Sequence, residues 1–256
     1  MCWHDRTAAE TIHKLAYDFN IRTFVETGTF KGVNAKYQSK NFGRVMSCEI
    51  NPEYFKIAEK RTVDCPNVYL FNQSSPEFLM CFKLLQLQII GTSIVFIYLD
   101  AHFYDPNLPP EDRWVVLKEL EALKEFRQCF VCIHDFDCSG LGHLTYDGQP
   151  LNFDLVVEKL TKVNPNFYYY CNTREHCEIH TEASIIGVPG MEADEDTIDN
   201  IQYSHTDDRR KYRGMLYCSP VELDLSRYEL VELKHPLLDD GRIVKRNEKL
   251  ITQETL

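Results

Sequence analysis

The feature that most constrains the fold lies between residues 22 and 61, where an apolar run, a turn and a helical pattern follow one another twice. The first apolar run ends at Gly28, and the second ends at an acid, Glu49, which follows Gly28 by 21 positions. A βαβ unit uses this separation to place a carboxylate beside a nucleotide ribose. Such a carboxylate can accept hydrogen bonds from both ribose hydroxyls. The segment therefore predicts a site for a cofactor that contains a nucleoside.

The glycines indicate which cofactor this is. A dinucleotide-binding loop has glycines at relative positions one, three and six, where this chain has Gly28, Phe30 and Val33. A P-loop is absent too, because Gly32 is not followed by lysine and serine or threonine. What remains is an acid in the strand, Glu26, with two spaced glycines after it. This pattern suits a cationic ligand without phosphate, because Glu26 can attract an ammonium or sulfonium.

With these residues the segment resembles the class I S-adenosylmethionine-dependent methyltransferases. Glu26, Gly28 and Gly32 match the first motif of that family, and Glu49 matches the second. Phe30 stands where many members carry another glycine. The resemblance covers roughly residues 20–190 and implies that the cofactor is S-adenosylmethionine.

Strand and helix patterns alternate through residue 165 and predict a doubly wound, Rossmann-like α/β fold. Helices should cover both faces of a mostly parallel sheet, and the resemblance implies seven strands with the last one antiparallel. We predict strands at about 22–27, 44–49, 68–71, 93–99, 129–133, 167–171 and 183–188. We predict helices at about 7–20, 31–40, 77–87, 109–126 and 153–163, and another that begins at Pro52.

The length of 256 residues and the hydrophobic content of 44% suit one sizeable domain with a full core. Acidic residues crowd residues 190–210, where we predict a solvated loop or lid. The pattern is apolar again over residues 214–233, so we expect this tail to pack back onto the domain. We divide the chain into an S-adenosylmethionine-binding domain, residues 1–190, and an acidic loop with a C-terminal extension, residues 191–256.

Composition excludes several classes of protein. The formal charge of -11 argues against a general binder of nucleic acid, which needs a basic stripe. The first twenty residues contain no apolar signal core, and no run approaches the roughly 18 apolar residues of a membrane span. The ten cysteines are scattered, which is typical of reduced, buried thiols. We therefore expect a cytoplasmic enzyme that does not associate with a membrane. The sequence leaves open whether this enzyme forms a homo-oligomer.

Polar side chains follow the predicted strands at the points where the strands end. Ligands of open parallel sheets gather beyond these carboxyl ends. The density of acids, imidazoles and amides there is the strongest functional signal that needs no resemblance. The five segments are Glu26 to Gly28, Glu49 and Ile50, Asn72 to Ser75, Asp100 to His102, and His134 to Asp137.

Gln73 and Ser74 follow the third predicted strand, where related enzymes present polar side chains to adenine. A glutamine amide can accept from the adenine amino group and donate to a ring nitrogen. The same residues also fit an ordinary capped helix start, with Ser74 or Ser75 capping toward Glu77, and the two interpretations are compatible. We predict that the cofactor site comprises Glu26, Gly28, Gly32, Glu49, Ile50, Gln73, Ser74 and Asp100.

Asp100 and the pair His134-Asp135 end two predicted strands that we expect to be neighbours, about 5 Å apart. Two carboxylates and an imidazole would satisfy a divalent cation such as Mg²⁺, Mn²⁺ or Fe²⁺. Such a cation lowers the pKa of a substrate hydroxyl and holds its oxygen in line with the methyl group. Alternatively, the two acids only bond the backbone at the strand ends.

This arrangement resembles the metal-dependent O-methyltransferases of the catechol and macrolide-sugar types. Those enzymes carry an acid after strand four and an acidic or amide pair after strand five. Asp100 and Asp135 match them, and His134 replaces the first acid of the pair. The lysine base of the catechol type is missing, so His102 or His143 would take its part unless both are surface residues. We predict Asp100, His102 and Asp135 as catalytic residues, and Asp100, His134 and Asp135 as metal ligands.

Our leading hypothesis is S-adenosylmethionine-dependent methyl transfer to a hydroxyl of a small molecule, such as a sugar or a phenol. A second hypothesis is a nucleotide- or nucleic-acid-modifying methyltransferase, although its Asn/Asp-Pro-Pro-aromatic signature is replaced here by residues 100–103. A third is a non-catalytic binding protein that retains the fold. The intact Glu26 and Glu49 argue against that third hypothesis, and Phe30 and the missing base argue for it.

Overall fold

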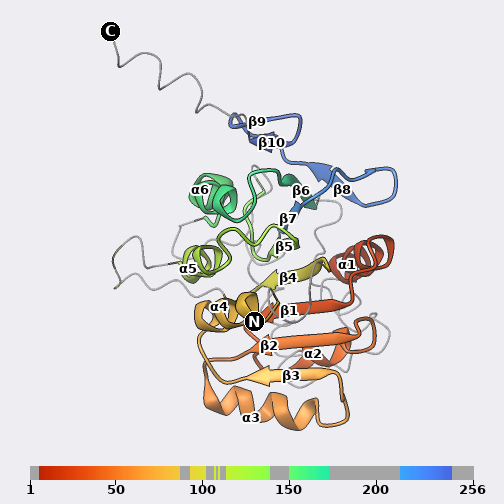
Figure 1. The fold of residues 1–256 in the computed structure, drawn as a ribbon, viewed down its shortest axis with the longest axis vertical. Helices are drawn as coiled ribbons and strands as arrows, with labels where there is room; N and C mark the ends of the chain where they lie inside the picture. The colour runs from red at the N-terminus through yellow and green to blue at the C-terminus, as the bar shows by residue number, and fades with distance from the viewer. Residues whose placement is uncertain are drawn as a thin grey trace, which may run out of the picture.

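The computed structural model describes residues 6–86, 93–101, 107, 109, 114–138, 150–172 and 214–243. In these residues an eight-stranded sheet runs through the molecule in the order β3-β2-β1-β4-β5-β7-β6-β8 (Figure 1). The strands are β1 (Thr23–Thr27), β2 (Arg44–Cys48), β3 (Val68–Phe71), β4 (Val95–Leu99), β5 (Cys129–Ile133), β6 (Tyr168–Asn172), β7 (Leu216–Ser219) and β8 (Leu230–Glu232). Two short strands, β9 (Leu238–Asp239) and β10 (Arg242–Ile243), form a separate hairpin.

Helices cover both faces of the sheet. Figure 1 shows α4, α5 and α6 on one side and α1 and α2 on the other. The helices are α1 (Arg6–Asp18), α2 (Val33–Gln38), α3 (Pro52–Arg61), α4 (Ser75–Leu85), α5 (Val115–Ala122) and α6 (Phe153–Val163). None of the helices in the described ranges is long and apolar enough to cross a membrane.

The predicted doubly wound, mostly parallel sheet is confirmed. Strands β1 to β5 pair in parallel, whereas β7 pairs antiparallel with both β5 and β6. The described sheet has eight strands, one more than predicted, because the short edge strand β8 pairs antiparallel with β6. The predicted strand at 183–188 lies outside the described residues, and the strand beside β5 comes from Leu216–Ser219.

The central strands are apolar along their whole length because both of their faces are buried. Neighbouring residues of each strand point to opposite faces and join two separate apolar clusters. On the α1 side, three phenylalanines in register stack across the sheet with ring centroids 6.0 and 6.2 Å apart. The stacked residues are Phe24, Phe96 and Phe130, and the row beside them, facing α4 to α6, is Val25, Ile97 and Val131.

One helix is shorter than predicted. The apolar stripe predicts a helix over 109–126, but α5 begins at Val115, because Trp114 has an extended backbone with φ -110° and ψ 107°. The helix ends at Ala122, and Glu125 shortly afterwards has a left-handed φ of 65°. Phe126 is nevertheless buried in the core. The apolar pattern extends to this residue because the chain still packs on the core after the helix has ended.

The tail from residue 214 onward belongs to the same sheet. Strand β7, which comes from the tail, lies between β5 and β6. The tail therefore supplies an interior strand of the sheet. Asp18 at the end of α1 accepts hydrogen bonds from the Arg227 guanidinium and from the Tyr228 hydroxyl. The Tyr170 hydroxyl accepts from the backbone N–H of Leu223 at 2.9 Å. The tail is thereby fixed to both the sheet and the first helix.

Candidate functional site

The polar segments predicted from the strand ends do meet at one edge of the sheet. Thr27 pairs with Cys48 on one side and with Leu99 on the other, and Leu99 pairs with Ile133. Since these strands are parallel, the residues that follow them emerge side by side. The sequence thus correctly placed the segments after β1, β2, β4 and β5 together.

The turn after β1 requires a glycine at its first position. Gly28 has a φ of +79°, which side chains disfavour, and its backbone N–H donates to the Cys48 carbonyl at 3.0 Å. A Cβ at this position would lie 2.8 Å from the Asp100 carbonyl oxygen. Gly28 therefore allows the turn to pack directly against the backbone at the end of β4.

A glycine is needed at position 32 for a different reason. It caps α2 with a φ of +79°, and a Cβ there would lie 2.9 Å from the Cα of Ala58 on α3. The glycine lets α2 approach α3 closely. Phe30, which stands where the resembled family often has a further glycine, adopts a left-handed φ of 51°, and its ring contacts Tyr54 edge-on at 4.5 Å.

Glu49 lies directly against the glycine turn. Its Oε2 accepts from the Phe30 N–H at 2.7 Å, and its Oε1 accepts from the Asn51 N–H at 2.8 Å. A carboxylate has about four acceptor positions, so each oxygen can still accept from a ligand. Ile50, the next residue, is 70% exposed, and the side chain of Asn72 holds the Glu49 carbonyl at 2.7 Å. The turn, the acid and the apolar neighbour form one continuous surface.

Glu26 lies beneath this surface. It is fully buried, and its two oxygens accept from Asn34 Nδ2 and Ser47 Oγ, each at 2.6 Å. Because the Ser47 hydroxyl donates to Glu26, the Thr29 hydroxyl must be the donor in its 2.5 Å contact with Ser47. Glu26 therefore supports the glycine turn from below. Direct contact between Glu26 and a cofactor cation stays a prediction.

Ser74 starts a helix, as predicted, which is compatible with a contact to adenine. It is the N-cap of α4, and its hydroxyl donates to Glu77 Oε2 at 2.7 Å. Gln73 beside it is half-buried at the same edge of the sheet. The contact of these two side chains with adenine stays a prediction.

Asp100, His134 and Asp135 converge as predicted. His134 Nδ1 lies 3.1 Å from Asp100 Oδ1 and 3.3 Å from Asp135 Oδ1, and the three side chains are at most 5% exposed. One potential ligand atom from each of the three residues lies within 4.8 Å of the others. Asp135 has a left-handed φ of 53°, an unusual backbone for a non-glycine residue that directs its carboxylate to the histidine. These acids therefore do more than bond the backbone at the strand ends.

The electrostatics of this trio favour a charged Asp100. Burial by itself would raise the pKa of Asp100, but the adjacent His134 imidazolium holds it well below its ordinary value. Asp135 opposes this effect slightly. With both carboxylates ionised, the trio carries a net negative charge in a buried place whether His134 is neutral or protonated, so it is suited to a cation.

Two predicted residues cannot be placed. His102 and His143 lie outside the described residues. Asn72, from the predicted segment after β3, holds the Glu49 carbonyl. Two residues that the sequence does not single out lie at the site: Asn34, which donates to Glu26, and the buried Glu119, which interacts with Asp100. The signal for Glu119 was available, since an acid in phase with Val116, Leu120 and Leu123 interrupts the apolar stripe of its helix.

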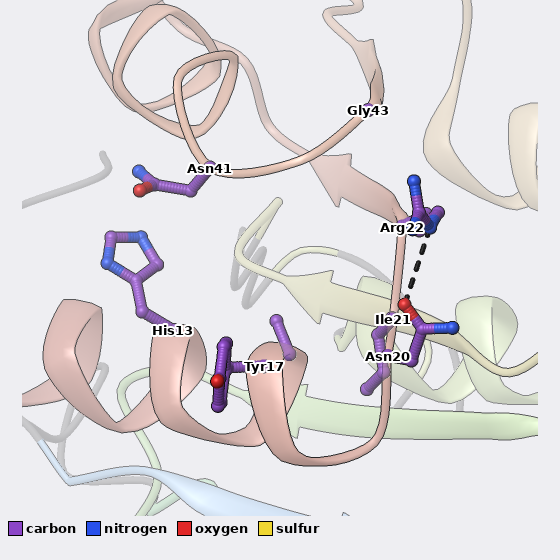
Figure 2. A pocket seen from close by; sticks show the side chains of 8 residues that line it. His13, Tyr17, Asn20, Ile21, Arg22, Asn41 and Gly43 are labelled. Atoms are coloured by element: carbon purple, nitrogen blue, oxygen red, sulfur yellow. Dashed lines mark hydrogen bonds between the residues drawn. The ribbon is translucent and has the colours of Figure 1, made fainter.

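A pocket of about 560 Å³ lies elsewhere, between α1 and the turns that precede β1 and β2. Figure 2 shows His13 and Tyr17 on one side of it and Asn41 and Gly43 on the other. Arg22, which donates to Asn20, closes one end. These positions are at the amino ends of the strands. The pocket is therefore separate from the site at the carboxyl ends.

Comparison with known proteins yields structural likeness alone. No protein-family model matches the chain, and no curated protein matches it. A SAM dependent methyltransferase from Aquifex aeolicus has 15% identity over 85% of this chain and 95% of its own, with a TM-score of 0.44. An rRNA methylase from Streptococcus thermophilus has 10% identity over 85% and 98%, with a TM-score of 0.47. A SAM dependent methyltransferase from Archaeoglobus fulgidus has 10% identity over 84% and 94%, with a TM-score of 0.43. These likenesses are too distant to identify an activity.

Proposed function

We propose that this protein binds S-adenosylmethionine and transfers its methyl group to a hydroxyl of a small molecule. One observation carries the proposal: the Glu49 carboxylate lies against the glycine turn, at 2.7 Å from the Phe30 N–H, at the tips of the adjacent strands β1 and β2. A nucleoside placed over this turn would present its ribose hydroxyls to a carboxylate that retains acceptor capacity.

The surrounding residues suit the other parts of this cofactor. The exposed Ile50 would contact the adenine face, and Gln73 and Ser74 would lie at its edge. The turn at Gly28, which packs against the backbone at the end of β4, would present its own backbone to the methionine part. The negative trio around Asp100 would favour the positive sulfonium and ammonium groups.

The same trio would act on the acceptor. Asp100 and Asp135 would orient the acceptor hydroxyl, and His134 Nδ1 lies 3.1 and 3.3 Å from the two carboxylates. Most of the rate would come from holding the acceptor oxygen in line with the methyl carbon. A hydroxyl acceptor is favoured because buried acids and an imidazole are the groups that polarise O–H bonds.

The donor set also fits a divalent cation. Two carboxylates, a neutral imidazole and a doubly charged cation sum to zero charge, which a buried site requires. Asp100, His134 and Asp135 would be the ligands, with the nitrogen ligand favouring Mn²⁺ or Fe²⁺ over Mg²⁺. Such a cation would lower the pKa of the acceptor hydroxyl.

Two alternatives are weaker. A nucleic-acid substrate would need a basic surface, and the chain carries a formal charge of -11. A non-catalytic binding protein would have no need for two buried acids around a histidine, with one of them in a left-handed backbone.

Calorimetry tests cofactor binding directly. The wild-type protein should bind S-adenosylmethionine and S-adenosylhomocysteine, and Glu49→Ala should raise both Kd values about tenfold or more because the ribose loses its acceptor. Glu53→Ala is the matched control, because Glu53 is an exposed acid a few residues away that pairs with Lys56. If the wild-type protein binds neither compound, the proposal fails.

Manganese titration tests the metal. Electron paramagnetic resonance should show Mn²⁺ bound by the wild-type protein and lost in Asp135→Asn, whereas Asp137→Asn, two residues further on, should bind as the wild type does. Equal binding by both variants would place the ion elsewhere. Absence of binding to the wild type would leave the trio to act on the acceptor without a metal.

A further inference from the structure

The pocket between α1 and the turns before β1 and β2 has no part in the proposed function. Its volume of about 560 Å³ falls within the range of roughly 300 to 1,000 Å³ that small-molecule sites occupy. Such sites combine apolar walls with a few polar groups that orient the ligand. Ala16 and Ile21 supply apolar surface in this pocket. His13, Arg22 and Asn41 supply polar groups (Figure 2). The pocket therefore has the composition of a ligand site.

Arg22 gives this pocket a positive charge. Its Nε donates to Asn20 Oδ1 at 3.3 Å, and no described carboxylate lies within ion-pair distance of its guanidinium. The remaining N–H groups of the guanidinium form a planar fork that binds a carboxylate through two parallel hydrogen bonds. A single guanidinium balances the charge of one carboxylate, whereas a phosphate dianion would leave an excess of negative charge on a chain of formal charge -11. The group expected at Arg22 is therefore a carboxylate.

Two rings from α1 line one side of the pocket. His13 and Tyr17 are four positions apart on the helix, so they lie on the same face of it, as Figure 2 shows. The His13 ring stacks on the buried Tyr37 with centroids 5.3 Å apart, which fixes its orientation. The Tyr17 ring is 87% exposed. A planar ligand along this side would cover apolar ring surface that water contacts in its absence.

The hydrogen bonds behind His13 decide what its ring can offer a ligand. Glu26 only accepts, so Asn34 Nδ2 donates to it at 2.6 Å, and Asn34 Oδ1 accepts from Gln38 Nε2 at 3.2 Å. Gln38 Oε1 is left to accept from His13 Nε2 at 3.1 Å. Burial lowers the pKa of His13, so the ring is neutral at neutral pH and Nδ1 carries a lone pair. No described residue bonds this nitrogen. His13 therefore offers an acceptor.

We propose that this pocket binds a small planar carboxylate that also carries an N–H or O–H donor. The carboxylate lies on the Arg22 guanidinium, the ring lies along Tyr17, and the donor bonds His13 Nδ1. The alternative is a hollow that holds only water. The inference does not depend on the proposed cofactor, because the pocket is at the amino ends of the strands and the cofactor site is at their carboxyl ends.

Three compounds test the three contacts on the full-length wild-type protein. Indoleacetate has a planar ring system, an N–H donor and a carboxylate; tryptophol lacks the carboxylate, and naphthaleneacetate lacks the donor. Titrations followed by amide NMR spectra give both the Kd and the place of binding. We expect indoleacetate to bind with a Kd of about 1 mM or lower and to shift the N–H signals of Asn20, Asn41 and Gly43. Tryptophol and naphthaleneacetate should each bind about fivefold more weakly or worse.

Two variants remove the polar contacts one at a time. Arg22→Met should raise the Kd of indoleacetate about tenfold and leave that of tryptophol unchanged, because tryptophol has no carboxylate to lose. His13→Phe keeps a ring on Tyr37 and should raise the Kd of indoleacetate about fivefold, but not that of naphthaleneacetate. A variant that fails to fold would lose both compounds of its pair, so each pair separates a lost contact from a lost fold. Lys14→Met removes a cation of α1 outside the pocket lining and should change no Kd more than about twofold.

A Kd of indoleacetate above about 10 mM for the wild type overturns the proposal. Equal binding of tryptophol and indoleacetate also overturns it, because the carboxylate would then contribute nothing. Shifts confined to residues outside the pocket lining, or displacement of indoleacetate by S-adenosylhomocysteine, would place the compound at another site and have the same consequence. If the protein binds no S-adenosylhomocysteine, the proposed function fails, but the three compounds still decide the role of the pocket.

Discussion

The Asn34 amide donates to Glu26 Oε1 at 2.6 Å, inside the core between α2 and β1. Gln38 Nε2 in turn donates to Asn34 Oδ1 at 3.2 Å, and His13 Nε2 lies 3.1 Å from Gln38 Oε1. A carboxylate only accepts hydrogen bonds, so Glu26 fixes the orientation of each amide in this row and makes His13 a donor. The row therefore connects Glu26, which lies beneath the glycine turn, with His13, which lies near the amino ends of the strands.

This row predicts the effect of removing Asn34. Asn34→Leu should lower the free energy of unfolding by about 2 to 3 kcal/mol, because a buried carboxylate loses a donor. Urea denaturation measures the change. Asn41→Ala is the control, since this exposed amide only bonds the Tyr37 carbonyl and its loss should cost less than about 0.5 kcal/mol. Similar midpoints for both variants would contradict the importance of the row.

Gly28 and Gly43 should respond differently to alanine. Gly28→Ala adds a Cβ at 2.8 Å from the backbone oxygen of Asp100 and holds alanine at a φ of +79°. It should cost about 2 kcal/mol or more, because the backbone must move. In Gly43→Ala the nearest atom is 3.6 Å away, and the Tm should barely change. Thermal unfolding followed by circular dichroism compares them, and equal Tm values would refute the close approach at Gly28.

The tail should be indispensable to folding. A chain that ends at residue 190 lacks β7, so β5 and β6 lose the strand between them and the buried Leu216, Tyr217 and Cys218. We expect it to aggregate or to lose near-ultraviolet circular dichroism. A chain that ends at residue 243 keeps every described strand and should behave as the full chain does. A cooperative, monomeric 1–190 protein would show that the tail is dispensable.

Glu119 should make stability depend on pH. Burial raises its pKa to about 7 in the folded protein, from an ordinary value of 4.5. Between these two pKa values the folded state binds more protons than the unfolded state. The protonated Glu119 therefore contributes to the free energy of unfolding in full below pH 4.5, and this contribution is lost as the pH rises through 7. The loss is on the order of 3 kcal/mol. Urea denaturation at several pH values should show it in the wild type and not in Glu119→Gln. Parallel profiles would mean that Glu119 titrates normally.

Local pattern was sufficient for most elements. The predicted bounds agree with β3, β5 and α6, because apolar runs and helical stripes reflect burial on two faces or on one. Pro52 begins α3 as predicted, with the Asn51 side chain accepting from Glu53 N at 2.8 Å. Local pattern failed at Phe126, where packing continues beyond the end of α5, and in the tail, where it did not predict the strands β7 and β8.

The sequence by itself determined that carboxylates, an imidazole and a glycine turn follow parallel strands, because residue order and periodicity are local properties. Only the tertiary structure decided how these groups meet. Glu26 turned out to lie under the turn, and Glu49 against it. Strand β7 entered between β5 and β6, and Glu119 came to lie near Thr27 and Ser75. These outcomes depend on strand order, register and packing between residues far apart in the chain, which no local pattern encodes.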